Sequence, residues 1–253
     1  MPNDENLGTL IVTGASRGIG AAIAALGGTR GYSVAVNFHS GEAEAKQVVK
    51  QIRAAGGRAH PIRVNMANEQ QIIEMFQKAE SELGRITALV NNAGITGGFA
   101  RVEDVSGEAL QQVFATNVTG AILCAREAVR RMSTRRGGAG GAIVNISSRA
   151  AEIGSAGEWV HYAASKGAID SFTIGLAREV ATEGIRVNAV APGLIDTELH
   201  AANGDPDRLR RLSGSIPMQR AARPEEVAET VLWLLSPAAS YVTGAILNVG
   251  GGR

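Results

Sequence analysis

Short apolar segments alternate with longer segments of mixed apolar and polar residues along the whole chain. The short segments are rich in residues that favour β-strands. They lie at 9–13, 33–37, 59–64, 88–91, 142–147, 186–191 and 245–249. The longer segments have helical patterns and lie at 19–30, 42–55, 69–83, 108–135, 158–182 and 225–235. This order predicts a series of strand–helix units.

The strand segments also indicate how the sheet is covered. "ALVNN" at 88–92 and "AIVNIS" at 142–147 are apolar without strict alternation, as expected for parallel strands that are buried on both faces. No linker, repeat or change of composition divides the chain. We therefore predict an α/β protein with a single domain over 1–253, a Rossmann-type, doubly wound parallel sheet of about seven strands with helices on both faces.

Two stretches fit this pattern less well. Gly27 and Gly28 lie late in the first predicted helix, where each costs about 1 kcal/mol relative to alanine. The segment at about 194–215 is long and polar, and Gly204 and Pro206 interrupt any helix in it. A loop of that length in a compact domain is usually functional, so we expect it to border a substrate.

Composition and charge narrow the class of protein. The chain has 25 Lys and Arg against 24 Asp and Glu, a net charge of +1, which gives no sign of a nucleic-acid or membrane partner. The single cysteine, Cys124, fits a reducing compartment. The N-terminus lacks a secretory signal pattern, and no apolar run reaches the roughly 18 residues of a membrane span. We expect a cytoplasmic protein.

The spacing of reactive residues disfavours two other kinds of site. The four histidines, His39, His60, His161 and His200, are scattered, so no metal site is predicted. The segment "REAVRRMSTRR" holds five arginines between 126 and 136 and would suit RNA or phosphate, but basic runs on a long helix are more often solvated faces. A Ser-His-Asp hydrolase is also disfavoured, because the chain has no G-x-S-x-G elbow.

A glycine-rich turn follows the first strand. In "LIVTGASRGIG" the glycines Gly14, Gly18 and Gly20 lie between the first strand and the first helix. Glycine allows a tight turn there and lets the backbone approach a pyrophosphate at the helix N-terminus. The spacing differs from G-x-G-x-x-G, but the position is the one that a nucleotide-binding fold requires.

The motifs together resemble the short-chain dehydrogenase/reductase family. "TGASRGIG" at 13–20 matches that family's T-G-x-x-x-G-x-G cofactor loop, and further family motifs follow in order: "NNAG" at 91–94, "TNVTG" at 116–120, "NISS" at 145–148, "YAASK" at 162–166 and "APGLIDT" at 191–197. The resemblance covers nearly the whole chain and is strongest to bacterial glucose-1-dehydrogenase-like and 3-oxoacyl-reductase-like members. It implies an NAD(P)-dependent enzyme that acts on CH–OH and C=O groups.

The resemblance also implies where the cofactor binds. Asn91, Ala93 and Gly94 would lie on the adenosine side and near the ribose, and the segment after the sixth strand would meet the nicotinamide. Asn65 stands where the family usually carries Asp, and an amide oxygen can also accept a hydrogen bond from adenine. The expected cofactor-binding residues are Gly14, Ser16, Arg17, Gly18, Ile19, Gly20, Asn37, Phe38, His39, Ser40, Asn65, Met66, Asn91, Ala93, Gly94, Tyr162, Lys166, Pro192, Gly193, Ile195 and Thr197.

Tyr162 and Lys166 are one helical turn apart, which suits proton transfer. Hydride transfer leaves the substrate oxygen in need of a proton partner, but tyrosine is a weak base because its ordinary pKa is about 10. A cation nearby would stabilise tyrosinate and lower the pKa of Tyr162, and Lys166 is spaced to supply it. The resemblance assigns Tyr162 as the acid/base and Lys166 also to the nicotinamide ribose.

The resemblance assigns two further catalytic positions. Ser148 would hydrogen-bond the substrate oxygen, and the side chain of Asn117 would hold a kinked helix and a proton-relay water. Ser148 precedes Tyr162 by one residue more than the commonest family spacing, and Arg149 stands at that commonest position. We attribute the difference to a one-residue insertion in "GEWVH" and keep Ser148 as the catalytic serine.

The end of the second strand predicts a preference for NADP(H) over NAD(H), with NAD(H) possible. Enzymes that use NAD commonly place an acid there to bind the ribose 2′-hydroxyl, and "SVAVNFHSGEAEA" has Asn37 and Phe38 instead. Arg17 offers a guanidinium suited to the 2′-phosphate, with Ser16, His39 and Ser40 as further donors.

The sequence leaves the substrate open. Residues 149–161 and 194–215 would line its pocket, with Glu158, Trp159, His161 and His200 as candidate contacts, and sugars, 3-oxoacyl esters and bulky ketones all fit. By analogy with the family we expect a homotetramer. The alternative function is a nucleotide-binding protein that has lost catalysis and acts through its assembly or a partner.

Overall fold

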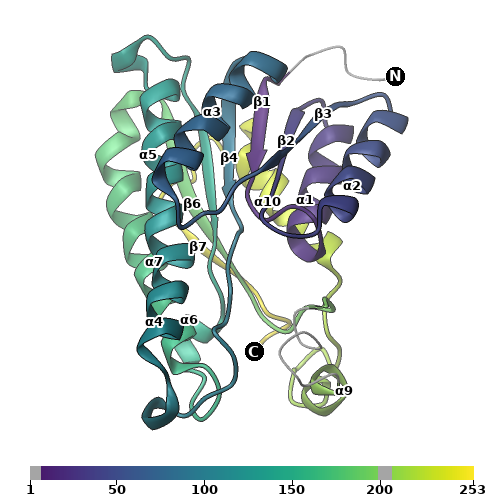
Figure 1. Ribbon diagram of the computed structural model, residues 1–253, viewed down its shortest axis with the longest axis vertical. Helices are drawn as coiled ribbons and strands as arrows, with labels where there is room; N and C mark the ends of the chain where they lie inside the picture. Colours follow the sequence, from purple (N-terminus) through teal and green to yellow (C-terminus); the bar gives the residue numbers. More distant parts are fainter. Residues whose placement is uncertain (1–6, 199–206) are drawn as a thin grey trace.

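One parallel sheet runs through the described part of the protein (Figure 1). The computed structural model describes residues 7–198 and 207–253. The sheet has seven strands in the order β3-β2-β1-β4-β5-β6-β7, and every neighbouring pair is parallel. The strands are β1 (Thr9–Val12), β2 (Ser33–Phe38), β3 (Arg58–Arg63), β4 (Ile86–Asn91), β5 (Gly141–Ile146), β6 (Ile185–Pro192) and β7 (Ile246–Val249). The predicted doubly wound fold is confirmed.

Helices pack on both faces of the sheet and enclose two apolar cores (Figure 1). One face carries α1 (Gly18–Thr29), α2 (Glu42–Ala54) and α10 (Pro224–Leu235), and the other carries α3 (Glu69–Leu83), α5 (Ala121–Met132) and α7 (Val160–Val180). The shorter helices are α4 (Gly107–Phe114), α6 (Ala150–Ile153) and α9 (Arg208–Ser213). Burial on both faces explains why the strands read as continuous apolar runs. No helix in the described ranges is long and apolar enough to cross a membrane.

The long helix predicted at 108–135 is interrupted. Helix α4 ends at Phe114, a π-helical segment follows at Ala115–Gly120, and α5 then begins at Ala121. A π-helical turn takes up an extra residue, and such turns occur frequently at functional sites. Apolar periodicity cannot reveal such an interruption, because it continues on both sides of it. Asn117 lies in the π-helical segment.

Close packing explains the two glycines late in α1. A Cβ atom at Gly27 would lie 2.7 Å from Leu10 Cδ2, and one at Gly28 would lie 2.5 Å from Ile52 Cγ2. Any larger residue would therefore push α1 away from β1 and α2. The lost helix propensity is the cost of bringing these elements together.

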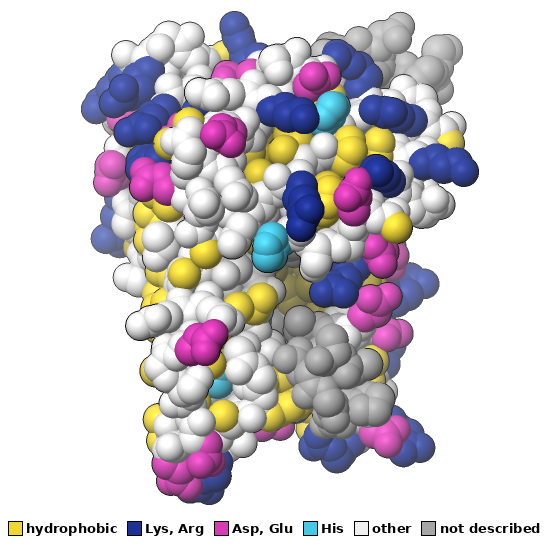
Figure 2. All heavy atoms as spheres, viewed as in Figure 1, with side chains coloured by type: hydrophobic (Ala, Val, Ile, Leu, Met, Phe, Trp, Pro, Cys, Tyr) yellow, Lys and Arg dark blue, Asp and Glu magenta, His cyan; other side chains and the backbone are white. Residues whose placement is uncertain are grey.

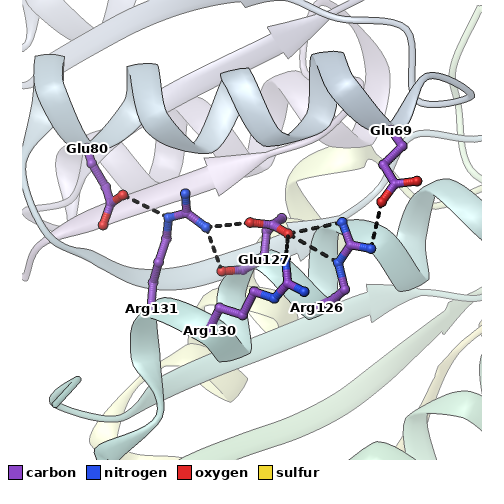
Figure 3. A network of polar contacts seen from close by, with 6 residues as sticks. All are labelled: Glu69, Glu80, Arg126, Glu127, Arg130 and Arg131. Carbon is purple, nitrogen blue, oxygen red and sulfur yellow. Dashed lines mark hydrogen bonds and ion pairs between the residues drawn. The ribbon is translucent and has the colours of Figure 1, made fainter. Parts of the chain in front are cut away.

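The arginines of α5 are tied into a network of ion pairs around Glu127 (Figure 3). The Glu127 side chain is only 3% exposed and receives hydrogen bonds from Arg126, Arg130 and Arg131. Arg126 also reaches Glu69 and Arg131 reaches Glu80, both on α3. Burial by itself raises the pKa of Glu127, but the hydrogen bonds from Arg131 and Arg126 lower it below its usual range. These arginines hold α5 against α3 and are not simply a solvated face.

Candidate active site

The carboxyl ends of the strands border a cavity of about 640 Å³. It lies where the order of the sheet reverses, between β1 and β4, which is where ligands bind in open α/β sheets. Its wall includes the loop after β1, the segments after β2, β4, β5 and β6, and the short helices α6 and α9 at the lower end of Figure 1. We call it the active-site cavity below.

Most of the predicted site residues meet in this cavity. They come from six separate segments of the chain, and all of them line the cavity: Gly14, Ser16, Arg17, Gly18, Ile19, Gly20, Phe38, His39, Ser40, Ala93, Gly94, Ser148, Tyr162, Lys166, Pro192, Gly193, Ile195 and Thr197.

Asn37 does not face the active-site cavity. Its side chain is 1% exposed, accepts a hydrogen bond of 3.0 Å from the Gly14 amide, and donates one of 3.2 Å to the Ile62 carbonyl. The interpretation of Asn37 as a direct cofactor contact therefore needs correction, because its side chain holds the glycine loop against β2. Phe38 and His39 form the wall at this point.

Asn65 and Met66 also lie away from the cavity wall. The Asn65 side chain accepts a 3.0 Å hydrogen bond from the Ala67 amide and so shapes the turn that precedes α3. Met66 is buried and packs beside Gly120, where a Cβ atom would come 2.4 Å from the Met66 carbonyl oxygen. Both residues make local structural contacts, and their contacts with a cofactor stay predictions.

Asn91 belongs to a buried chain of hydrogen bonds beneath α7. Its Nδ2 donates to Asn145 Oδ1 at 2.9 Å, and Asn145 Nδ2 donates to Thr173 Oγ1 at 2.8 Å. Thr173 in turn donates to the Ile169 carbonyl at 2.8 Å. The chain links β4, β5 and α7, so it fixes the helix that carries Tyr162 and Lys166 relative to the sheet. The neighbouring Asn92, which we did not predict, lines the cavity instead.

The glycine loop forms a cradle that fits a dinucleotide. Gly14 and Gly18 have φ values of 63° and 55°, which favour glycine, and a Cβ atom at Gly14 would lie 2.9 Å from Ala93 Cα. The N-cap residue of α1, Arg17, makes no side-chain cap hydrogen bond, and the first turn carries no acidic residue. The positive end of the helix dipole is thus directed at the cavity, where a pyrophosphate suits it.

Tyr162, Lys166 and Ser148 lie together on the opposite wall. Lys166 is 4% exposed, its Nζ donates a 2.7 Å hydrogen bond to the Ile146 carbonyl, and it lies 5.6 Å from the centre of the Tyr162 ring. Ser148 hydrogen-bonds Tyr162, and its Oγ also accepts from the Ala150 amide at 3.1 Å. Arg149, at the commonest family spacing, also lines the cavity, and its Nε donates to the Arg253 carbonyl at 2.8 Å.

The pKa directions at this wall are set mainly by burial. Burial raises the pKa of Tyr162 above its ordinary value, and the hydrogen bond with Ser148 opposes that shift. Burial lowers the pKa of Lys166 to about 8, and the Asp170 carboxylate opposes that shift. The net direction for the pKa of Tyr162 is upward, because burial outweighs the hydrogen bond with Ser148. The lowering of that pKa by Lys166 stays a prediction.

Asn117 borders the site from the π-helical segment. Its Nδ2 donates to the Ile95 carbonyl at 2.9 Å and to Ser165 Oγ at 3.0 Å, while its Oδ1 accepts from the Ile95 amide at 2.9 Å. These bonds leave at most one lone pair of Oδ1 for a water. A Cβ atom at Gly94 would lie 3.4 Å from Asn117 Oδ1 and 3.5 Å from Lys166 Nζ, so the three positions are neighbours.

The residues that line the substrate part of the cavity differ from the predicted substrate contacts. Glu158 and Trp159 line the cavity, but His161 is 5% exposed and hydrogen-bonds the Thr96 carbonyl at 2.8 Å through Nε2. His200 lies outside the described residues. Arg208 on α9 also lines the cavity; it lies within the predicted segment 194–215 but was not singled out there. No local motif marks it, since its partner is 50 residues away in the chain.

Other kinds of site find little support in the described residues. They contain no group of His, Cys, Asp and Glu side chains that could hold a metal ion. Basic and acidic side chains are interspersed over the upper part of the face in Figure 2. Together with the paired arginines of α5, this distribution does not favour nucleic-acid binding.

Sequence comparisons point to one family. A family model described as enoyl-(acyl carrier protein) reductase matches residues 14–253. The chain is 50% identical over 243 residues to a protein named uncharacterized oxidoreductase YgfF from Escherichia coli (strain K12), a match that covers 96% of this chain and 98% of the relative. It is 39% identical over 244 residues to glucose 1-dehydrogenase 2 from Bacillus subtilis (strain 168), covering 96% and 93%.

Solved structures agree with the sequence relatives. A mutant of a Serratia marcescens short-chain dehydrogenase/reductase is 33% identical and superposes with a TM-score of 0.90, covering 98% of each chain. A blue fluorescent protein from a metagenomic library, in complex with NADPH, is 33% identical with a TM-score of 0.89, covering 98% of this chain and 99% of that one.

Proposed function

Because this chain belongs to the short-chain dehydrogenase/reductase family of oxidoreductases, we propose that it transfers a hydride between NADP(H) and a carbonyl or secondary-alcohol substrate. The observation that carries the proposal is the shared wall of Ser148, Tyr162 and Lys166 facing the glycine loop across one cavity. The family's resident cofactor supplies the nicotinamide carbon that gives or accepts the hydride. The residues of this chain supply binding, orientation and the proton.

The proton would pass through the Tyr162 hydroxyl. In the reducing direction Tyr162 donates its proton to the substrate oxygen as that oxygen gains negative charge, and in the oxidising direction it accepts the proton back. A raised pKa favours the protonated hydroxyl, which is the form needed for reduction. Ser148 would hydrogen-bond the same substrate oxygen and stabilise its developing charge.

Lys166 and Asn117 would orient the reacting groups. Lys166 is held by the Ile146 carbonyl, so its ammonium stays next to Tyr162 and Gly94, where the ribose of the cofactor is expected. Asn117 braces the chain after β4 through both hydrogen bonds with Ile95. Its remaining lone pair on Oδ1 is where a relay water would bind.

Substitution of Tyr162 tests the proposed chemistry. Purified protein is assayed on a panel of carbonyl compounds and polyols, with cofactor absorbance as the readout, together with Tyr162→Phe. We expect the variant to lose turnover by about 10²-fold or more and to keep its affinity for NADPH. Unchanged turnover in Tyr162→Phe would remove the tyrosine from the mechanism. Cofactor binding without turnover on any substrate would favour the alternative of a catalytically silent nucleotide-binding protein.

A preference for NADP(H) is part of the proposal. Arg17 is exposed at the mouth of the cavity, with His39 and Ser40 beside it, and no carboxylate lies at positions 37 to 40. Glu198 lies 3.9 Å from the Arg17 guanidinium, a long and exposed pair that contributes little. A 2′-phosphate would meet a guanidinium and two further donors there.

The preference is tested at Phe38 rather than at Asn37. A carboxylate at position 37 would face the Gly14 amide inside the fold, whereas Phe38 lines the cavity. We expect Phe38→Asp to lower kcat/KM with NADPH relative to kcat/KM with NADH. We expect Arg17→Ala to weaken the binding of NADPH more than the binding of NADH. If the wild type prefers NADH, or neither variant changes the ratio, the 2′-phosphate is not recognised by this loop.

We further propose a homotetramer of this chain. Large apolar side chains are exposed on two separate surfaces: Leu110, Phe114 and Ile122 along α4 and α5, and Trp233 and Tyr241 on and after α10. Two apolar surfaces on one subunit suit an assembly with two kinds of interface. A monomeric mass by light scattering at micromolar concentration would contradict the proposal.

A further inference from the structure

Arg208 joins helix α9 to the wall of the active-site cavity. Its Nη1 donates to Glu158 Oε1 at 2.7 Å and its Nη2 to Glu158 Oε2 at 2.6 Å, which is the geometry of a bidentate pair. Arg208 is only 5% exposed, although it belongs to a short helix at the edge of the molecule. The segment before α7 and the segment after β6 are thereby held together.

The guanidinium of Arg208 rests on an aromatic platform. It lies 4.5 Å from the centre of the Trp159 ring and 5.5 Å from that of Phe99. Those two rings are stacked, with centroids 4.6 Å apart, and Trp159 meets Tyr162 edge to face at 6.1 Å. A continuous line of contacts therefore runs from α9 through Trp159 to the proposed acid/base.

Stability alone is a poor explanation for this arrangement. Burying the Arg208 guanidinium costs desolvation that its pair with the partly exposed Glu158 only partly recovers, and Arg208 Nε is buried without a hydrogen-bond partner. The Trp159 indole nitrogen is also buried and unpartnered. Glu158, Trp159, Tyr162 and Arg208 all line the same cavity. A costly arrangement at the place of reaction indicates a role in the reaction.

We propose that Arg208 is a positioning residue, which holds Trp159 beside Tyr162 through its ion pair with Glu158 and so fixes the wall against which the substrate lies. The inference rests on the proposed hydride transfer. It gives Arg208 a part in that reaction, although Arg208 contacts neither the hydride nor the proton that is transferred. A wall that moves by a fraction of an ångström changes the alignment of the substrate carbon with the Tyr162 hydroxyl. Loss of Arg208 therefore affects the carbonyl substrate and leaves the cofactor side, across the cavity, intact.

Kinetics of Arg208→Met and Glu158→Gln test the role in the reaction. We expect kcat/KM for a carbonyl substrate to fall about tenfold in each variant, while the Kd for NADPH stays within about twofold of wild type. The double variant should be no worse than either single variant, because both remove the same ion pair. The charge-reversed pair Arg208→Glu with Glu158→Arg should recover part of the loss. The matched control is Arg210→Met on the same helix, whose exposed side chain pairs with Asp207.

Fluorescence of Trp159 provides a readout that does not depend on turnover. The chain has two tryptophans, so the measurement uses a Trp233→Phe background. We expect acrylamide quenching of Trp159 to rise about twofold in Arg208→Met and not in Arg210→Met, since Arg208 lies over the ring whereas Arg210 pairs with Asp207. Equal quenching in both variants, or additive kinetic losses for Arg208 and Glu158, would overturn the proposal. Failure of the hydride-transfer proposal would show separately, as a Tyr162→Phe variant with unchanged turnover.

Discussion

Replacing the buried Glu127 carboxylate should destabilise the protein more than its position on an arginine-rich surface suggests. In Glu127→Gln the amide keeps the size of the side chain, but it cannot balance the charges of Arg126, Arg130 and Arg131, which all converge on it (Figure 3). Removing one partner of a fully buried pair costs about 3–5 kcal/mol. Arg126 and Arg131 retain Glu69 and Glu80, and Arg130 is half exposed to water. We therefore expect a loss of about 2–3 kcal/mol.

The loss can be measured by thermal unfolding at a fixed protein concentration. For a chain of this length it corresponds to a fall in Tm of about 4–12 °C. The control is Glu69→Gln, which breaks an exposed pair in the same network and should cost less than about 1 kcal/mol. Equal shifts in the two variants would refute the reasoning, because they would show that burial of Glu127 contributes nothing.

The same prediction has a defined dependence on pH. The folded pKa of Glu127 lies below its unfolded value of 4.5, so its stabilisation is fully present above that value and is lost as pH falls through the folded pKa. The difference in stability between wild type and Glu127→Gln should therefore narrow as pH falls below 4.5. A difference that widens on acidification would contradict the assigned direction of the shift.

Three further outcomes follow from the site and the core. Gly14→Ala should weaken NADPH binding about tenfold, measured by titration calorimetry, because φ is 63° at that position and the new Cβ would lie 2.9 Å from Ala93 Cα. NADPH affinity should fall as pH rises through about 8, where Lys166 loses its proton, and Lys166→Met should flatten that profile. Gly28→Ala should cost about 1–3 kcal/mol in urea unfolding, and adding Ile52→Leu should recover part of that cost, because leucine lacks the Cγ2 methyl that the new Cβ would meet at 2.5 Å.

Features that depend on spacing along the chain could be predicted well. The parallel sheet follows from the alternation of apolar and helical segments, and the cavity residues around Gly18 and Tyr162 follow from a motif after the first strand and a motif within a helix. The orientation of single residues on β2 could not be predicted. That strand is buried along its whole length, so its pattern does not show whether residue 37 or residue 38 faces the cavity.

Features that join distant segments were also beyond the sequence. Glu158 was a candidate for substrate contact, but its partner Arg208 lies on a helix that the polar composition of 194–215 did not predict. The direction of the pKa shift of Tyr162 could not be predicted for the same reason. Burial raises this pKa, and the segments that bury the hydroxyl are distant from one another in the chain. In each case the missing information is which surfaces pack together in three dimensions.

The buried hydrogen-bond chain from Asn91 through Asn145 to Thr173 bears on how the protein can diversify. It anchors α7 from below, on the sheet side, whereas the residues expected to meet a substrate lie in the segments before α7 and after β6. Changes in those segments leave the anchor untouched. New substrates can therefore be acquired through mutations in the loops while Tyr162 and Lys166 keep their alignment, which separates the evolution of specificity from that of the chemistry.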